Sequence, residues 1–386
     1  MKKQKICIIG GSLTGLITSI ALSKLNCEID IITGSTNANL KSSRTTAISQ
    51  NNLEFLNELD ISNLLKKELW ACANMKLYTE NHNKKTLELL DFNINKVNKK
   101  VLYMMENKKI RNILMNQIKK NKLISLIKNK NISQINDSGI LKSVKLEKKF
   151  IKYNLIIICT GNNSALVKNF FKDQIIEDSY NEMSLTAVLK HDTLKNDTAR
   201  QFFYNKEILA LLPISNTRTS VVYFIKKNNK QNNLFYKNKI KSHVKNYFKN
   251  IIFESNIEYG EANFLIRKNY FKDRTLLFGD ALHVIHPFAG QGFNMVLRDL
   301  KFLKDILDKK ISLGLDIGSL DVLSEFSKKT KLNNFAFSIG LDILKKSFSV
   351  NNKFFNEGRN NLLQILNKNN YAKNIFYNIA NEGLKL

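Results

Sequence analysis

The chain has 386 residues, of which 43% are hydrophobic and 10% aromatic, enough for two or three domains with substantial cores. This composition excludes a disordered chain and a small disulfide-stabilised domain. The formal net charge is +28, from 61 Lys and Arg against 33 Asp and Glu. Lysine is spread along a chain rich in Asn and Ile, so we attribute the charge mainly to an AT-rich genome. A basic surface for nucleic acid or an anionic membrane is the alternative.

Cysteine usage and hydropathy indicate the compartment. The four cysteines, Cys7, Cys27, Cys72 and Cys159, include no CxxC pair, so we expect no disulfide framework, no zinc site and a reducing compartment. No apolar run approaches the roughly 18 residues of a spanning helix. The N-terminal segment resembles a signal peptide, but three glycines interrupt it and no cleavage site follows. We therefore expect a cytoplasmic protein that does not span a membrane.

The first 33 residues predict a strand, a turn, a helix and a second strand. Lys5–Ile9 and Glu28–Ile32 are short apolar runs, and Leu13–Leu25 has helical periodicity. The glycine-rich turn over residues 10–15 separates the first strand from the helix. This βαβ opening is typical of a parallel sheet.

After this N-terminal βαβ unit, the chain to about residue 160 predicts short strands, a helix and a buried strand. Short strands are predicted at Met75–Tyr78 and Thr86–Phe92. A basic helix is predicted over Met105–Ile127, and a buried strand over Leu155–Cys159. The sequence therefore alternates helical and extended segments, as α/β proteins do.

From residue 180 to 265 the pattern changes to alternating apolar and polar residues. Met183–Leu189, Ile208–Pro213 and Thr219–Ile225 predict an antiparallel sheet with one solvated face. Thr275–Phe278 then returns as a buried strand, and a helix begins near Gly292. Beyond about residue 320 the chain reads as helical and basic.

The glycine-rich turn approximates the G-x-G-x-x-G pattern of dinucleotide-binding folds. Gly10 allows the tight turn, and Gly15 lets the helix pack close to the strand. The helix N-terminus offers unpaired N–H groups to a pyrophosphate. Ser12 replaces the second glycine, and Thr33 stands where an acidic residue usually grips a ribose. A glycine-rich turn without a ligand is the alternative interpretation.

A second glycine-rich segment, from Leu277 to Asn294, reads LFGDALHVIHPFAGQGFN. Asp280 at a strand end can accept hydrogen bonds from sugar-alcohol hydroxyls. Gly290 and Gly292 allow backbone to approach a flat ring closely. The following helix can direct its N-terminus at the ring edge where negative charge gathers on reduction.

This segment resembles the second flavin signature of the para-hydroxybenzoate-hydroxylase-like monooxygenases, especially the branch that hydroxylates ubiquinone precursors. Further resemblance lies in Arg44-Thr45-Thr46-Ala47-Ile48 and in Glu106-Asn107 with Arg111. Each arginine taken alone fits a solvated surface charge, but their order and spacing favour cofactor contact. The two prolines of the chain, Pro213 and Pro287, fall in segments that the family places at its active site.

The resemblance implies an α/β fold, with a Rossmann-like FAD-binding domain, an interleaved mixed β-sheet substrate domain and a C-terminal helical tail. The FAD-binding domain is expected at 1–72, 101–178 and 269–320. The substrate domain is expected at 73–100 and 179–268, and the helical region at 321–386.

The resemblance also implies a set of site residues. His286, Pro287 and Phe288 are expected to line the ring-side loop as catalytic residues. The opposite, substrate-binding wall is expected at Leu211, Leu212 and Pro213. The expected cofactor-binding residues are Gly10, Gly11, Ser12, Gly15, Thr33, Arg44, Arg111, Gly161, Gly279, Asp280, Gly290, Gln291, Gly292, Phe293 and Asn294.

The implied activity is hydroxylation of a polyprenylphenol ring through a flavin C4a-hydroperoxide, with FAD as cofactor, O2 as co-substrate and no metal. Expected partners are the polyprenylated phenol, a quinone-biosynthesis protein complex and, transiently, the surface of the inner membrane. A flavoprotein that acts on tRNA is disfavoured because no nucleic-acid motif is present, so no nucleic acid is expected.

Three positions depart from the family pattern, at Ser12, Thr33 and Thr160. Thr160 stands where the family carries an aspartate that helps to arrange the pyrophosphate and a transient nicotinamide cofactor. We therefore expect NAD(P)H to reduce the flavin poorly and another electron donor to be needed. The departures also suggest the alternative of a non-catalytic FAD-binding component of a quinone-biosynthesis complex.

Overall fold

The fold was analysed in a computed structural model. It describes residues 3–34, 42–80, 85–93, 100–128, 132, 134–147, 149–161, 164–171, 175–204, 207–227, 231–287 and 290–384. None of the described helices is long and apolar enough to cross a membrane.

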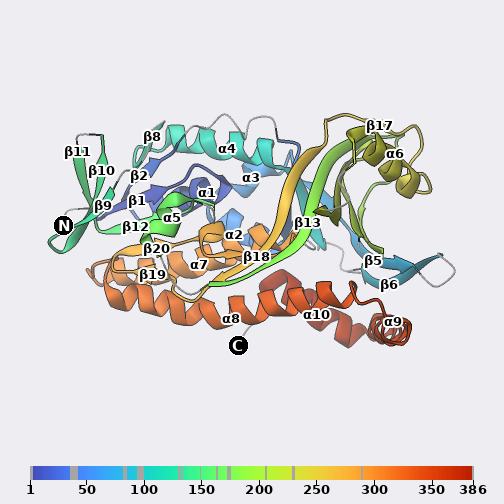
Figure 1. Ribbon diagram of the computed structural model, residues 1–386. Helices are drawn as coiled ribbons and strands as arrows, with labels where there is room; N and C mark the ends of the chain where they lie inside the picture. Colours follow the sequence, from blue (N-terminus) through green and yellow to red (C-terminus); the bar gives the residue numbers. More distant parts are fainter. Residues whose placement is uncertain are drawn as a thin grey trace.

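A six-stranded sheet in the order β19-β20-β12-β1-β2-β8 forms the half of the molecule in which a cofactor is expected, the cofactor half (Figure 1). Its central strands run parallel and are almost wholly apolar, so both faces can be covered by helices. The strands are β1 Lys5–Ile9, β2 Glu28–Ile32, β8 Ile124–Ile127, β12 Leu155–Ile158, β19 Phe271–Lys272 and β20 Thr275–Leu277. The helices are α1 Leu13–Ser23, α4 Asn107–Lys120, α5 Ala165–Phe170 and α7 Gln291–Ser312.

A larger mixed sheet forms the other half, in the order β21-β18-β13-β16-β15-β14-β5-β6 with β17 paired to β13. Helix α6, Asn233–Val244, packs an apolar stripe against one face of this sheet. The long strands β13 and β18 run from this sheet toward the cofactor half (Figure 1). The strands are β5 Asn74–Glu80, β6 Thr86–Asn93, β13 Ile175–Lys190, β14 Thr198–Tyr204, β15 Glu207–Ser215, β16 Arg218–Lys226, β17 Ile252–Phe253, β18 Glu258–Arg267 and β21 His283–Val284.

Two small sheets and two short helices complete the α/β part. One sheet has the order β3-β7-β4, and its strands are β3 Thr45–Ser49, β4 Trp70–Cys72 and β7 Leu102–Glu106. The other has the order β11-β10-β9, and its strands are β9 Gln134–Ser138, β10 Leu141–Leu146 and β11 Lys149–Tyr153. The short helices are α2 Gln50–Glu58 and α3 Ser62–Leu65.

Three helices, α8 Leu320–Ser347, α9 Lys353–Lys368 and α10 Asn370–Glu382, end the chain. Helix α8 runs along the base of the molecule under both halves (Figure 1). Phe348 and Leu363 are buried against the face of the large sheet opposite α6. The terminal helices therefore close the core of the large sheet and join it to the cofactor half.

The expected fold class is confirmed: a Rossmann-like α/β unit with an interleaved mixed sheet and a helical C-terminal part. The helix expected over Met105–Ile127 is wrong at both ends. The chain leaves β7 at Glu106, is helical to Lys120, and returns as β8 from Ile124. Parallel pairing of β8 with β2 accounts for this difference, because it satisfies backbone groups that a longer helix would use internally.

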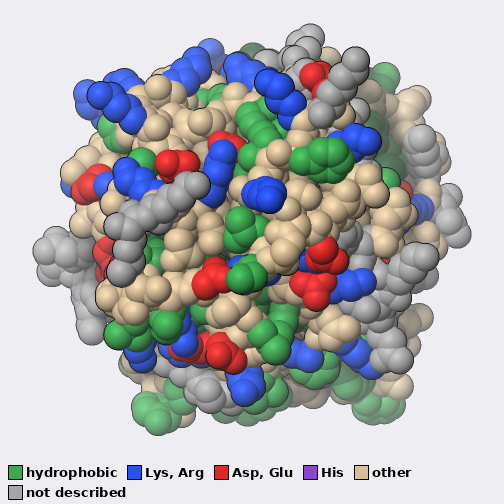
Figure 2. Space-filling model, turned by 90° about the vertical axis from the view of Figure 1, so that its left-hand side faces the viewer, with side chains coloured by type: hydrophobic (Ala, Val, Ile, Leu, Met, Phe, Trp, Pro, Cys, Tyr) green, Lys and Arg blue, Asp and Glu red, His purple; other side chains and the backbone are tan. Residues whose placement is uncertain are grey.

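Basic side chains are scattered rather than gathered on the face at the β9–β11 end of the molecule. Figure 2 shows Lys and Arg there interspersed with Asp and Glu and with uncharged surface. This distribution is what a composition-driven charge of +28 produces. On this face no continuous basic track of the kind that follows a nucleic-acid backbone is visible.

Candidate functional site

The glycine-rich turn joins β1 to α1 at the carboxyl edge of the six-stranded sheet. Gly10 has a φ of +127°, and its N–H donates to the Ile32 carbonyl at 2.9 Å. A Cβ on Gly15 would lie 1.9 Å from the Gly10 carbonyl oxygen, so only glycine lets α1 close onto the turn. Ser12 caps α1 without a side-chain hydrogen bond to the helix. The first N–H groups of α1 therefore border this turn without a side-chain cap.

A second turn, Gly279–Ala281, follows β20 and packs against the first turn of α1. Gly279 has a φ of +64°, and a Cβ there would lie 2.7 Å from the Thr14 side chain. This close packing places Asp280 at the edge of the cleft described below, where its side chain is exposed. Desolvation by the surrounding protein raises the pKa of the Asp280 carboxyl, and the neighbouring His283 and Arg44 only partly offset this.

The N-terminus of α7 forms the third wall. Gly290 caps the helix with a φ of +66°, and a Cβ there would lie 2.7 Å from Ala47. Asn294 fixes this arrangement, because its Nδ2 donates to the carbonyls of Ala47 at 3.1 Å and Gly290 at 3.2 Å. Its Oδ1 accepts the Ser49 N–H at 2.9 Å. A Cβ on Gly292 would meet no atom within 4 Å, so the helix start leaves open space.

These three walls enclose a cleft of about 600 Å³. Eight of the expected site residues line it: Ser12, Arg44, Arg111, Asp280, Pro287, Gly290, Gly292 and Phe293. A second cleft of about 350 Å³ lies at the end of β2, where Gly11, Thr33 and Arg111 are among the lining residues. Arg111 lines both clefts, and its Nη1 donates to the Gly11 carbonyl at 2.6 Å. The two clefts thus meet at the glycine-rich turn.

The residues around the joined clefts fit FAD. An elongated dinucleotide needs a continuous path past a helix N-terminus, which the shared Arg111 and Gly11 border. The buried hydroxyls of Thr33 and Thr160 have no hydrogen-bond partner within the protein. The open space at Gly292 leaves room for a ring, and the Asp280 carboxylate can accept from ribitol hydroxyls.

Not every expected cofactor residue faces a cleft. Gly10, Gly15 and Gly279 act through close packing, and Asn294 acts through its hydrogen bonds. Gln291 is buried in the first turn of α7, and its Oε1 has no partner. A Cβ on Gly161 would meet open space, so no packing demand for glycine exists there.

The ring-side loop differs most from expectation. Pro287 lines the cleft, but the imidazole of His286 is 2% exposed and does not. Its Nε2 lies 3.2 Å from Glu182 Oε2, and its ring packs against Tyr180 and Phe224. Direct contact between His286 and a substrate is therefore not what this geometry offers. Phe288 lies outside the described residues.

The expected substrate-binding strand is β15, whose side chains alternate between the two faces of the large sheet. Leu211 packs into the core under α6, so its expected place in the wall is wrong. Leu212 and Ile214 instead join an apolar cluster with Ala47, which lines the cofactor cleft. Pro213 is buried and pairs with Thr219 of β16. The apolar surface beside the cofactor cleft thus comes from Leu212 and its neighbours.

Sequence reasoning missed Glu258 of β18, which also lines the cleft. Its Oε2 accepts from the Ser42 hydroxyl at 3.1 Å and lies 3.9 Å from Arg44 Nε. Glu258 thereby ties the segment before β3 to the large sheet. No local signal marks this residue, because its partners lie more than 200 positions earlier in the chain.

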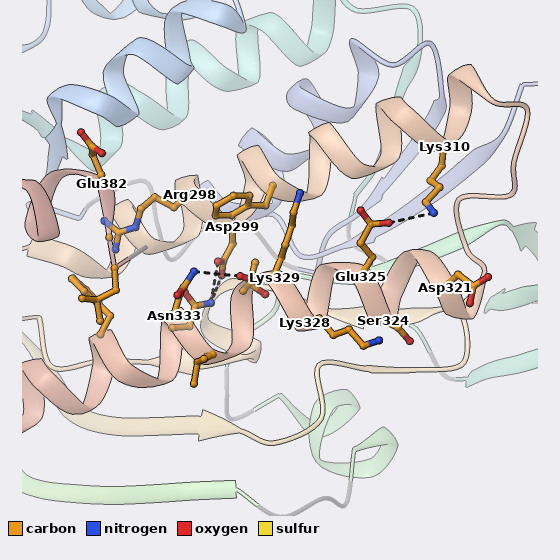
Figure 3. Close-up of a pocket in the computed structure, with 17 residues that line it drawn as sticks. Arg298, Asp299, Lys310, Asp321, Ser324, Glu325, Lys328, Lys329, Asn333 and Glu382 are labelled. Atoms are coloured by element: carbon orange, nitrogen blue, oxygen red, sulfur yellow. Dashed lines mark hydrogen bonds and ion pairs between the residues drawn. The ribbon is translucent and has the colours of Figure 1, made fainter. Parts of the chain in front are cut away.

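A larger hollow of about 920 Å³ lies between α7 and α8, away from the motifs. Figure 3 shows side chains of both signs facing one another across it, with Lys310 Nζ 3.2 Å from Glu325 Oε2. Asp299 on its wall accepts from Asn334 and lies 2.8 Å from His283 Nε2. None of the expected site residues lines this groove.

Comparison with known proteins decides the family. A family model described as FAD binding domain matches residues 3–312. The chain belongs to this family. Its match covers every motif that builds the two clefts, and FAD is the cofactor of the chain.

Curated relatives place the chain near ubiquinone hydroxylases. It is 25% identical over 335 residues to the mitochondrial ubiquinone biosynthesis monooxygenase COQ6 of Dictyostelium discoideum, covering 72% of this chain and 68% of that protein. It is 23% identical to the ubiquinone hydroxylase UbiM of Neisseria meningitidis, covering 64% of this chain and 55% of that one. A shorter match to the 3-demethoxyubiquinol 3-hydroxylase of Escherichia coli is 38% identical over 82 residues. It covers 21% of this chain and 21% of that protein.

Solved structures show the same fold. The p-nitrophenol 4-monooxygenase PnpA of Pseudomonas putida matches with a TM-score of 0.79 at 12% identity, covering 100% of this chain and 99% of that one. HpxO of Klebsiella pneumoniae, solved with FAD and uric acid, matches with a TM-score of 0.78 at 12% identity, covering 98% and 97%. Together with the family match, these relatives confirm the prediction of an FAD-dependent monooxygenase.

Proposed function

We propose that this member of the FAD-binding domain family hydroxylates the aromatic ring of a polyprenylated phenol in ubiquinone biosynthesis. The observation that carries the proposal is the apolar cluster of Ala47, Leu212 and Ile214 beside the cofactor cleft. Ala47 belongs to both, so an apolar ring lying there would adjoin the flavin site. The names of the curated relatives support the same substrate class.

Bound FAD supplies the activation of O2. Overall, a ring C–H becomes C–OH while O2 and two electrons with two protons yield one water. The protein orients the reactants: Asp280 and Arg111 hold the cofactor, Asn294 fixes the start of α7, and Leu212 with Ile214 excludes water from the ring.

The test combines genetics with isotope labelling. Deleting the gene should accumulate an under-hydroxylated quinone precursor, and the holoenzyme given that precursor, an electron donor and ¹⁸O2 should add one labelled oxygen. A protein that holds FAD yet incorporates no label with any donor would instead be the non-catalytic FAD-binding component of a quinone-biosynthesis complex. Normal quinone content in the deletion strain would remove the pathway assignment.

The electron donor is part of the proposal. Thr160 provides a neutral hydroxyl, buried and unpaired, where the resembling family carries an aspartate. We expect NADPH alone to reduce the flavin bound to the unaltered protein at least tenfold more slowly than the flavin bound to the Thr160→Asp variant. The reason is that a carboxylate can orient both the pyrophosphate and the nicotinamide. Anaerobic stopped-flow absorbance measures this rate. Fast reduction of the unaltered protein by NADPH would contradict the expectation.

A polyprenylated substrate resides in the bilayer, so the enzyme is proposed to contact an anionic membrane surface through α9 and α10. Phe354, which is 82% exposed, shares one side of α9 with Leu362 and Ile365, and exposed Tyr371 lies in the first turn of α10. Lys353 and Lys368, at the two ends of α9, flank these apolar side chains and can bind anionic lipid headgroups.

Vesicle flotation tests this contact. The double variant Phe354→Ser with Ile365→Ser should lose at least 80% of the binding to phosphatidylglycerol vesicles, since buried apolar area drives interfacial binding. The matched control is Phe150→Ser, because Phe150 is 54% exposed on β11 at the other end of the molecule. Equal binding by the double variant and the unaltered protein would place any membrane contact elsewhere.

A further inference from the structure

A buried ionic cluster lies directly behind the ring-side loop. Glu182 of β13 and Lys345 of α8 are both nearly inaccessible, and Lys345 Nζ lies 2.8 Å from Glu182 Oε1. Lys226 of β16 reaches the same oxygen at 3.1 Å. The other oxygen, Oε2, faces His286 Nε2 at 3.2 Å. One carboxylate therefore links three separate elements to the loop.

The geometry of β13 places Glu182 there. Its pairing with β18 is interrupted between Ser179 and Glu182, so Tyr180 and Asn181 bulge out of register. Asn181 adopts a φ of +51° in this bulge. The Tyr180 ring then lies under Lys345, with Nζ 4.1 Å from the ring centre, and its hydroxyl donates to Asp342 at 2.7 Å. A bulge of this kind changes the direction in which the side chains of a strand point, here those of Tyr180 and Glu182.

The charges in the cluster define its hydrogen bonds. Burial opposes ionisation of Glu182, but hydrogen bonds from His286 and Lys345 and the charge of Lys345 prevail and lower its pKa to about 2. Burial also lowers the pKa of His286, so the imidazole is neutral at neutral pH. A carboxylate has no hydrogen to give, so Nε2–H of His286 is the donor and Nδ1 remains without a partner.

His286 immediately precedes Pro287, which lines the cofactor cleft, and is four residues before Gly290, which caps α7. We propose that Glu182 and Lys345 are positioning residues that hold the ring-side loop against the flavin through His286. Helix α8 is thereby coupled to the cofactor site across a single chain of contacts from Lys345 to Glu182 to His286. The inference concerns FAD alone, so it does not depend on which substrate the enzyme hydroxylates.

The test replaces the histidine by groups of similar size. In His286→Phe the ring still packs on Tyr180 and Phe224, but the bond to Glu182 is lost. The dissociation constant for FAD should rise about tenfold, matching the loss of one charge-assisted hydrogen bond, and the visible absorption maxima of bound flavin should shift. His286→Gln can still donate to Glu182 and should restore both values to within about threefold of the unaltered protein.

A matched control separates positioning from general destabilisation. His191 is also a buried histidine, stacked on Phe248 and hydrogen-bonded to Thr219. Its partner Phe248 belongs to the core between the large sheet and α6, and His191 lines neither cleft. His191→Phe should lower the melting temperature while leaving FAD affinity and the flavin spectrum unchanged. If His286→Phe leaves both readouts unchanged, or if His191→Phe moves them equally, the proposal is overturned.

The coupling to α8 has its own variant. Lys345→Met keeps an unbranched side chain of nearly the same length but removes the ammonium group and its bond to Glu182, which retains Lys226 and His286. A rise in the FAD dissociation constant of about threefold, in the same direction as His286→Phe, is expected. This variant also serves if His286→Phe does not fold. An unaltered dissociation constant in Lys345→Met would remove α8 from the positioning chain.

Discussion

Gly15→Ala should destabilise the protein by about 3 kcal/mol or more and abolish FAD binding at micromolar cofactor. The added Cβ would lie 1.9 Å from the Gly10 carbonyl oxygen and 3.6 Å from the Cys159 side chain. The oxygen belongs to backbone that β1 and β2 hold in place, since the Gly10 N–H donates to Ile32. Helix α1 must therefore move away from the turn, which opens the cofactor cleft.

Gly340→Ala is the matched control, because Gly340 also lies inside a helix but has no atom within 4 Å of an added Cβ. Alanine favours helix over glycine, so this variant should be up to about 1 kcal/mol more stable than the unaltered protein. Urea unfolding measures both free energies, and flavin fluorescence measures FAD binding. Similar stability changes in the two variants would show that the close contact at Gly15 is not what excludes a side chain.

The opening of the cofactor half was predictable because its signals are local. The strands Lys5–Ile9 and Glu28–Ile32 match the structure residue for residue, and the helix begins at Leu13 as expected. Apolar runs and glycine punctuation within about 30 residues suffice to define a βαβ unit. The walls at Asp280 and Gly290 follow from the same kind of local pattern.

The misplaced features depend on partners that are distant in sequence. Ile124–Ile127 continues a helical spacing of apolar residues, and only its pairing with β2 makes it a strand. Which of Leu211 and Leu212 faces the cleft depends on the register of β15, and one residue of register exchanges the two faces. His286 is buried where its Nε2–H donates a hydrogen bond to Glu182, which lies more than 100 positions earlier in the chain. Periodicity within a segment cannot report such contacts.

Asp280 illustrates how the cofactor site trades stability for binding. Although the residue is exposed at the edge of the cleft, desolvation by the surrounding protein raises the pKa of its carboxyl, so the ionised form is less favourable in the fold than in the unfolded chain. At pH values above the raised pKa this difference lowers the free energy of unfolding, because the carboxyl loses its proton more readily in the unfolded chain. The cleft thus holds a charge that destabilises the protein until a ligand donates hydrogen bonds to it.

Asp280→Asn should therefore raise the melting temperature of the cofactor-free protein by about 1–3 °C at pH 7. The same variant should weaken FAD binding by about 10- to 100-fold, because hydrogen bonds to a charged acceptor contribute about 1.5–3 kcal/mol. Asp280→Ala should weaken binding further, since no acceptor remains. Calorimetric titration of the cofactor-free protein with FAD measures the affinities.

Asp137→Ala is the control, because Asp137 is an exposed aspartate on β9 that does not line either cleft. It should leave FAD affinity unchanged. The stability gain of Asp280→Asn should also shrink as the pH falls, because protonation of the native carboxyl removes the charge that the variant lacks. A variant that both loses stability and keeps FAD affinity would mean that Asp280 supports the fold rather than the cofactor.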